Sequence, residues 1–312
     1  MINRRDFLHT TAAITTSAIG FDALAADKDE LSVLDTHVHV WDLKQFKLPW
    51  LTPDAPFAKN YLISDYVDAT KGTGLSKCVY MEVDVAADQK QKEADWIRGV
   101  IKEGKSPFVA AIVGCVVRDK GFANYARQFK GDPYVKGLRQ VVHVKETPAG
   151  FILNDDVVAA MKVLGECNLT FDLCMRHSDL QDAVKLTAKC PDTRFVLDHC
   201  GNPNVQAKDH TAWKKDLEAL AKNKNVIIKI SGILFTAKKG EWTPEQLAPI
   251  VNHCIDTFGP DRAIFASDWP VCTVGGTYKQ WLDAVKTITK NRKEEERKKL
   301  FHDNAAKFYG LK

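Results

Sequence analysis

Short apolar runs rich in β-branched residues recur along the chain, and most are followed by an amphipathic stretch with charged residues at helical spacing. Such runs are typical of buried strands, and the intervening 3.6-residue periodicity is typical of surface helices. The pattern predicts strands over residues 31–38, 77–83, 108–117, 135–142, 169–175, 194–199, 225–231 and 262–267. It predicts helices over residues 90–103, 155–166, 179–189, 212–222, 244–257 and 278–289.

Strands that alternate with helices indicate parallel βαβ units, and eight such units close into an α/β (β/α)₈ TIM barrel. We therefore expect residues 27–312 to form a single barrel domain. The alternative is an open doubly wound sheet, but no G-x-G-x-x-G or P-loop follows any predicted strand. Thr243 and Pro244 suit the N-cap and first turn of a helix, and Gly259-Pro260 suits its end.

The first 26 residues differ from the rest of the chain. Arg4-Arg5 is followed by Phe7-Leu8, then by a weakly apolar stretch over residues 10–19 and by Ala23-Leu24-Ala25, an A-x-A cleavage pattern. These are the regions of an export signal, and the paired arginines indicate the twin-arginine type. We expect residues 1–26 to be recognised by the twin-arginine export machinery and removed. That places the mature protein in the bacterial periplasm or outside the cell, without a membrane anchor. An amphipathic first helix is the alternative.

Composition excludes several classes of partner. The net charge of +4 is too small to favour nucleic acid or an anionic membrane, and no apolar run is long enough to span a bilayer. Four of the eight cysteines, Cys78, Cys115, Cys174 and Cys200, fall within or at the end of apolar strand-like runs, where cysteine behaves as a small buried hydrophobe. No C-x-x-C or Cys/His finger spacing indicates a structural zinc site. A small-molecule partner remains.

His37 and His39 alternate with a valine at the end of the first predicted strand. Side chains at i and i+2 share one face of a strand and lie about 6.6 Å apart along it. Two imidazoles so placed can approach one metal ion or one polarised carbonyl. A chance His-x-His is the alternative in a chain with nine histidines.

The active site of a TIM barrel lies at the carboxyl ends of its strands. Those ends carry Arg139 after strand 4, His199 after strand 6 and Asp268 after strand 8, while Lys229 within strand 7 is interpreted as structural. Asp268 and His199 are the predicted catalytic residues: Asp268 can accept a proton from water, while the histidines polarise a carbonyl. A turn aspartate, a core histidine and a structurally paired arginine are the alternatives. No G-x-S-x-G nucleophile elbow is present.

Three imidazoles and one carboxylate make a plausible shell for one divalent metal ion, most readily zinc. The predicted ligands are His37, His39, His199 and Asp268. The predicted substrate-binding residues are Arg139, Trp41 and Glu82. Among these, Arg139 offers five donors in a fixed fork for polar ring substituents.

The motifs D-T-H-V-H-V-W-D, G-L-R, L-D-H-C-G-N-P, K-I-S-G and S-D-W-P-V resemble the amidohydrolase-related family of the amidohydrolase superfamily. Within it they are most similar to the branch of sugar lactonases that includes L-fuconolactonase and L-rhamnonolactonase. The resemblance implies a (β/α)₈ barrel, hydrolysis at a carbonyl, and roles for the three histidines and Asp268. Two departures stand out. Strand 5 ends in Arg176 and His177 without the ligand histidine of many metal-dependent relatives, and no lysine suited to carbamylation ends strand 4.

Three functions follow from these features. A lactonase that opens a sugar-acid lactone is the leading hypothesis. A metal-dependent non-oxidative decarboxylase of the same superfamily is the second, and a non-catalytic sugar-binding barrel is the third. Because some lactonases of the resembled branch are thought to work without metal, catalysis without an ion also remains open.

Overall fold

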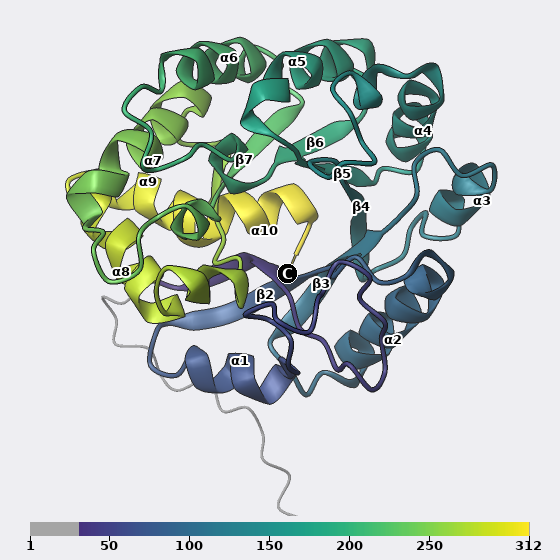
Figure 1. The fold of residues 1–312 in the computed structure, drawn as a ribbon, viewed down its shortest axis with the longest axis horizontal. Coiled ribbons are helices and arrows are strands. Elements are labelled where there is room, and N and C mark those ends of the chain that lie inside the picture. The colour runs from purple at the N-terminus through teal and green to yellow at the C-terminus, as the bar shows by residue number, and fades with distance from the viewer. Residues whose placement is uncertain (1–30, 312) are drawn as a thin grey trace, which may run out of the picture.

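The computed structural model describes residues 31–311, and the expected export signal at 1–26 lies outside this range. Eight parallel strands pair in chain order, each with the next (Figure 1). The strands are β1 Val33–Val38, β2 Leu75–Met81, β3 Phe108–Gly114, β4 Val135–Val141, β5 Thr170–Cys174, β6 Arg194–Leu197, β7 Val226–Ile230 and β8 Ala263–Phe265. The eight predicted strands and the (β/α)₈ barrel are confirmed, and the open sheet is excluded.

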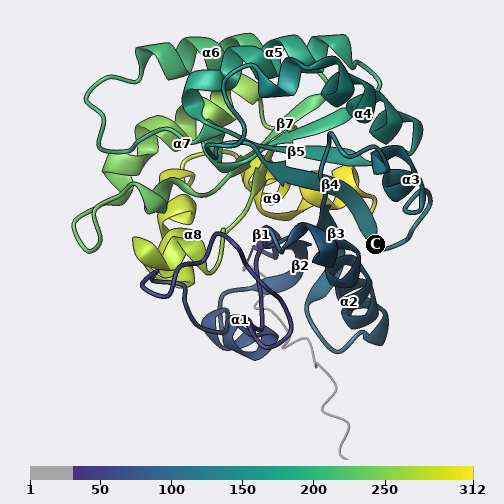
Figure 2. The same ribbon diagram turned by 45° about the vertical axis from the view of Figure 1, so that its right-hand side comes forward.

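Helices surround the strands on the outside, apart from the last one, which lies within the ring in the view of Figure 1 (Figures 1 and 2). The helices are α1 Ile63–Ala69, α2 Lys90–Glu103, α3 Phe122–Arg127, α4 Asp155–Glu166, α5 Leu180–Lys189, α6 Thr211–Ala221, α7 Pro244–Phe258, α8 Tyr278–Ile288, α9 Glu294–Lys298 and α10 Asn304–Tyr309. The six predicted helices are confirmed to within one residue at each end. Thr243 and Gly259 cap α7 as expected. Within residues 31–311, none of the helices combines the length and the apolarity needed to cross a membrane.

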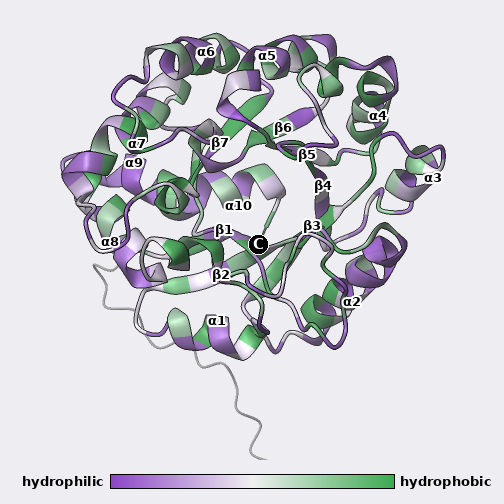
Figure 3. Ribbon diagram, in the orientation of Figure 1, coloured by the Kyte–Doolittle hydropathy of each residue, from purple (hydrophilic) through white to green (hydrophobic). Residues whose placement is uncertain are grey.

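The lower part of the barrel interior is apolar, and parts of the ribbons of β2 and β3 have the hydrophobic colour in Figure 3. Side chains such as Leu34, Val79 and Ile112 are fully buried there, together with Ala305 and Tyr309 of α10. Helix α10 lies across the end where the strands begin. One contact that places it there is the hydrogen bond from Arg194, at the start of β6, to the carbonyl of Phe308 at 2.6 Å. The barrel interior is therefore closed at this end.

The upper part of the interior is charged. Ile227 and Lys229 are two residues apart on β7, so their side chains share the face that points into the barrel. Lys229 meets Asp172 of β5, with which it forms an ion pair, and Asp198 after β6, whose Oδ1 lies 3.1 Å from Lys229 Nζ. All three charged side chains are fully buried. A charged layer thus forms the floor beneath the carboxyl ends of the strands.

A short seam joins the last strand to the first. His39 N donates to Trp269 O at 2.8 Å, and Asp268 N donates to His37 O at 2.9 Å. Because these bonds follow the ends of β8 and β1, the residues that close the barrel are the predicted site residues or their neighbours.

A buried carboxylate completes the seam. Asp35 Oδ1 accepts hydrogen bonds from Ser267 N at 2.8 Å and from His37 N at 3.2 Å, and Asp35 Oδ2 accepts one from Tyr66 Oη at 2.9 Å. Burial raises the pKa of Asp35 to about 6, although the hydrogen bond from Ser267 acts in the opposite direction. The Asp35 side chain therefore supplies hydrogen bonds between β1 and the segment after β8, where the short β8 does not extend the backbone hydrogen-bond ladder.

The eight cysteines are all buried and free. This confirms the expectation that Cys78, Cys115, Cys174 and Cys200 serve as small apolar side chains within the barrel wall.

Candidate active site

A cavity of about 570 Å³ opens at the carboxyl ends of the strands. Five of the predicted site residues line it: His39, Trp41, Arg139, His199 and Asp268. Its volume falls within the range of small-molecule sites. The loops after the strands therefore enclose a space at the end of the barrel where the sequence analysis predicted the active site.

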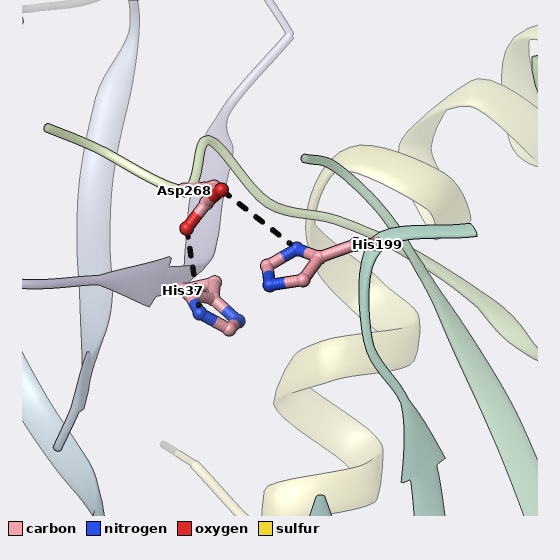
Figure 4. Close-up of side chains that lie close together, drawn as sticks. All are labelled: His37, His199 and Asp268. Atoms are coloured by element: carbon pink, nitrogen blue, oxygen red, sulfur yellow. Dashed lines mark ion pairs between the residues drawn. The ribbon is translucent and has the colours of Figure 1, made fainter. Parts of the chain in front are cut away.

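Three histidines converge on the carboxylate of Asp268, and Figure 4 shows two of them. Asp268 Oδ1 lies 3.6 Å from His37 Nε2 and 3.4 Å from His39 Nε2. Asp268 Oδ2 lies 3.9 Å from His199 Nδ1. Residues from both ends of the chain and from the middle are thus brought together, and all four are more than 90% buried.

The orientation of His39 follows from its backbone partners. His39 Nδ1 lies 2.9 Å from Glu82 O and 3.1 Å from Met81 O. Because a carbonyl only accepts, Nδ1 carries the proton, and in the neutral ring Nε2 keeps its lone pair. That lone pair is directed towards Asp268 and towards His37 Nε2, which is 3.1 Å away.

His37 lies beneath the cavity floor and is held from below. Its Nδ1 is 3.4 Å from Asp198 Oδ1 and 3.3 Å from Lys229 Nζ. Burial holds the pKa of His37 well below its usual value, although the charge of Asp198 acts in the opposite direction. Burial would raise the pKa of Asp198, but the charge of Lys229 and the hydrogen bond from His37 hold it well below its usual range. A neutral imidazole therefore rests on an ionised carboxylate.

The strand-7 motif K-I-S-G shapes the position of His199. Ser231 Oγ lies 3.0 Å from His199 Nδ1. A Cβ on Gly232 would approach the His199 ring to 2.5 Å, so only glycine leaves room for that imidazole. Burial lowers the pKa of His199 against the opposing charge of Asp268, so at neutral pH this ring is also uncharged.

Arg139 and Glu82 form a buried pair. Arg139 Nε donates to Glu82 Oε1 at 2.7 Å, Arg139 Nη2 donates to Glu82 O at 2.9 Å, and Arg139 Nη1 lies 3.3 Å from His37 Nε2. Each nitrogen of the guanidinium thus already has a protein partner. Arg139 lines the cavity as a fixed positive charge, whereas Glu82 is fully buried and is not part of the cavity lining. The structure places Glu82 as a support for Arg139.

Backbone strain concentrates around the same cavity. Six non-glycine residues in the described range have positive φ, and four of them, Asp84, His199, Asn202 and Asp268, line the cavity. Such conformations cost about 1–3 kcal/mol each and gather at functional sites. Their clustering supports this cavity as the working site of the protein.

The donor set fits one divalent metal ion. Two atoms that each bond the same zinc ion at about 2.0–2.2 Å lie roughly 3–4 Å apart. His37 Nε2, His39 Nε2 and Asp268 Oδ1 are separated by 3.1, 3.4 and 3.6 Å. His37, His199 and Asp268 also offer ligand atoms that all lie within 4.8 Å of one another. Arg139 competes for His37 Nε2, so a positive group adjoins that nitrogen with or without an ion.

Sequence reasoning did not assign a function to Asp172, Asp198, Ser231 or Gly232, and it interpreted Lys229 only as structural. The spacing Lys-x-Ser-Gly could have indicated Lys229, Ser231 and Gly232, since it puts a cation inside the barrel and a hydroxyl at the end of the strand. His177 and Arg176 also line the cavity. The guanidinium of Arg176 is bound to Asp179 and to two backbone carbonyls.

Comparison with known proteins places the chain among amidohydrolases. The Amidohydrolase family model matches residues 34–311. An uncharacterised protein from Sinorhizobium fredii is 31% identical over an alignment of 304 positions, which covers 90% of this chain and 99% of that protein. An L-fucono-1,5-lactonase from Burkholderia multivorans is 25% identical over 89% of this chain and 96% of its own. A zinc-bound amidohydrolase structure from Burkholderia multivorans has a TM-score of 0.79 and 21% identity, covering 90% of this chain and all of that chain.

Proposed function

Because this chain belongs to the amidohydrolase family, we propose that it is a hydrolase that opens a lactone ring by attack of water on the ring carbonyl. The observation that carries the proposal is the carboxylate of Asp268, which faces three imidazoles at the bottom of a substrate-sized cavity. The chain has no G-x-S-x-G elbow, so water is the nucleophile that this arrangement serves.

In the proposed reaction, Asp268 accepts a proton from the attacking water, and the positive charge of Arg139 stabilises the oxyanion that develops on the carbonyl. His37, His39 and His199 surround the Asp268 carboxylate and complete a polar floor. The proton then passes to the ring oxygen as the carbon–oxygen bond breaks. The product is a hydroxy acid.

The charges of the cavity favour a neutral substrate over the carboxylate that a decarboxylase needs. Within residues 31–311, the cavity lining contains two arginines and no lysine, and both guanidiniums are already bound to protein groups. A substrate carboxylate would find no uncommitted arginine or lysine in this lining. This observation supports the lactonase over the decarboxylase.

We expect purified protein to release one equivalent of acid for each lactone ring it opens, because hydrolysis produces a carboxylic acid. A pH-indicator assay measures this release. The panel contains sugar-acid lactones of five and six members, which the sequence resemblance favours, and simple lactones without hydroxyl groups. Carbon dioxide release from aromatic or unsaturated acids, with no lactone opened, contradicts the proposal. Binding of lactones without turnover indicates a non-catalytic barrel.

We also propose that His37, His39, His199 and Asp268 hold one zinc ion. A bound zinc ion would polarise the carbonyl and lower the pKa of its water. We expect elemental analysis to find about one zinc per chain and chelation to reduce turnover about 100-fold or more, with recovery on adding zinc. His39→Ala removes a ligand and should lower the zinc content, whereas His253→Ala, on the outer helix α7, should not. Full activity in protein shown to be metal-free excludes a catalytic ion.

A further inference from the structure

Two aromatic rings at the cavity are unusually exposed. Five large hydrophobic side chains in the described range are exposed, and the two aromatic ones, Trp50 at 40% and Phe235 at 57%, both line the cavity. Single exposed hydrophobic residues are common, but exposed aromatic groups that share one concave site mark a binding surface. They come from different loops, after β1 and after β7.

Two indole rings, those of Trp41 and Trp50, line the cavity. Trp50 Nε1 donates to Val83 O at 2.8 Å, and Trp41 Nε1 donates to Lys59 O at 2.8 Å. Both N–H groups are therefore used within the protein, and the two rings pack edge to face with centroids 6.0 Å apart. With Phe57, Ile233 and Phe235, these rings form an apolar wall that we call the aromatic wall.

The polar side chains above the floor are largely committed to protein partners. Asn202 Nδ2 donates to Met175 O at 2.8 Å, Ser178 Oγ donates to Asp179 Oδ1 at 2.9 Å, and Asp84 pairs with Lys90 at 3.1 Å. Among the described lining residues, His143 and His177 form no side-chain hydrogen bond to another residue, so their imidazoles are available to some of the hydroxyls of a polyhydroxylated ring but not to all of them. Each hydroxyl buried without a partner costs about 1–3 kcal/mol.

The cavity is also larger than a lone sugar lactone requires. At about 30 Å³ for each water molecule in the liquid, its 570 Å³ equals the volume of about 19 waters. A six-membered sugar lactone has only about 12 non-hydrogen atoms, each taking less space than a water.

We infer that the substrate is a lactone with an aromatic-sized apolar body and few hydroxyl groups, which stacks on the aromatic wall while its carbonyl meets Asp268. This inference rests on the proposed lactone hydrolysis and names its substrate class. It differs from the sugar-acid lactone expected from the sequence resemblance.

Hydrolysis of three six-membered lactones tests the inference: dihydrocoumarin, which is fused to an aryl ring, δ-valerolactone, which is bare, and D-glucono-1,5-lactone. We expect kcat/KM to be at least about tenfold higher for dihydrocoumarin than for the sugar lactone. Phe235→Ala should lower kcat/KM for dihydrocoumarin about threefold to tenfold, because aromatic contact is lost, and should change that for δ-valerolactone less than twofold. Leu62→Ala, an equally apolar exposed residue outside the cavity lining, is the matched control and should change neither.

Binding separates this inference from the proposed reaction. The lactam analogue 3,4-dihydro-2-quinolinone should quench the tryptophan fluorescence and bind at least tenfold more tightly than δ-valerolactam, even if no lactone is opened. Phe235→Ala should weaken that binding by the same factor as it lowers kcat/KM. Equal binding of the two lactams, or a preference for D-glucono-1,5-lactone that Phe235→Ala does not change, overturns the inference. Failure of every lactone to react, with the lactam preference intact, overturns the reaction alone.

Discussion

Asp268→Asn is expected to lower kcat by about 10²–10⁴-fold, since loss of a positioned general base has that effect. The substitution keeps the shape and the hydrogen-bonding distances of the side chain but removes its capacity to take a proton from water. Asparagine also tolerates the left-handed backbone found at this position, where φ is 58°. The seam bond from the amide of residue 268 is retained, so the variant should fold.

Steady-state kinetics on the best lactone of the panel measures this effect, and circular dichroism confirms the fold. Asp84→Asn is the matched control: Asp84 also lines the cavity with positive φ, but its carboxylate pairs with Lys90. Asp84→Asn should lower kcat less than about tenfold, because we expect this side chain to contact the substrate equally in the ground state and the transition state. Near-normal turnover by folded Asp268→Asn would assign the base to another group.

Lys229→Met is expected to lower the free energy of unfolding by about 3–5 kcal/mol, because it leaves buried carboxylates without their cation. Lys229 is fully buried between Asp172 and Asp198. Burial would lower the pKa of Lys229, but these two acids raise it, so the lysine is charged. Methionine has a similar length and fills the space without the charge.

Urea denaturation followed by circular dichroism measures the loss. The double variant Lys229→Met, Asp172→Asn should recover part of it, since one fewer carboxylate is left unpaired. Lys238→Met is the matched control: Lys238 pairs with Glu241 on the surface, where an ion pair contributes about 0–1 kcal/mol. If Lys229→Met unfolds at the same urea concentration as the parent protein, the buried ion pairs do not stabilise the barrel.

The sequence predicted the barrel well because its strands are buried on both faces and so are mostly apolar, with few polar residues in each. The long helices were equally clear, since each spans about three turns or more. Helices α1, α3 and α10 have only six or seven residues, too few to establish a 3.6-residue period. Their formation depends on packing against the barrel, which a single sequence does not display.

The site was predicted from one rule, that side chains at the carboxyl ends of the strands meet, and the structure brings His37, His39, His199 and Asp268 together. What lies under them was harder to predict. Two residues that form an ion pair here, Lys229 and Asp172, are 57 positions apart in the sequence. Glu82 follows the last residue of β2, where regular alternation ends, so the direction of its side chain could not be read from strand periodicity.

The two strands that meet at the seam are synthesised at different times: β1 is among the first parts of the chain to be made, and β8 is among the last. Asp35 and Ser267 are 232 residues apart, and at about 5–20 residues per second the ribosome needs roughly 10–50 s to travel between them. During that interval β1 has neither β8 beside it nor a backbone donor from Ser267 for its buried carboxylate. A nascent chain that ends before β8 also lacks Asp268. Closure of the fold and assembly of the proposed site therefore both wait for the last strand of the barrel to be synthesised.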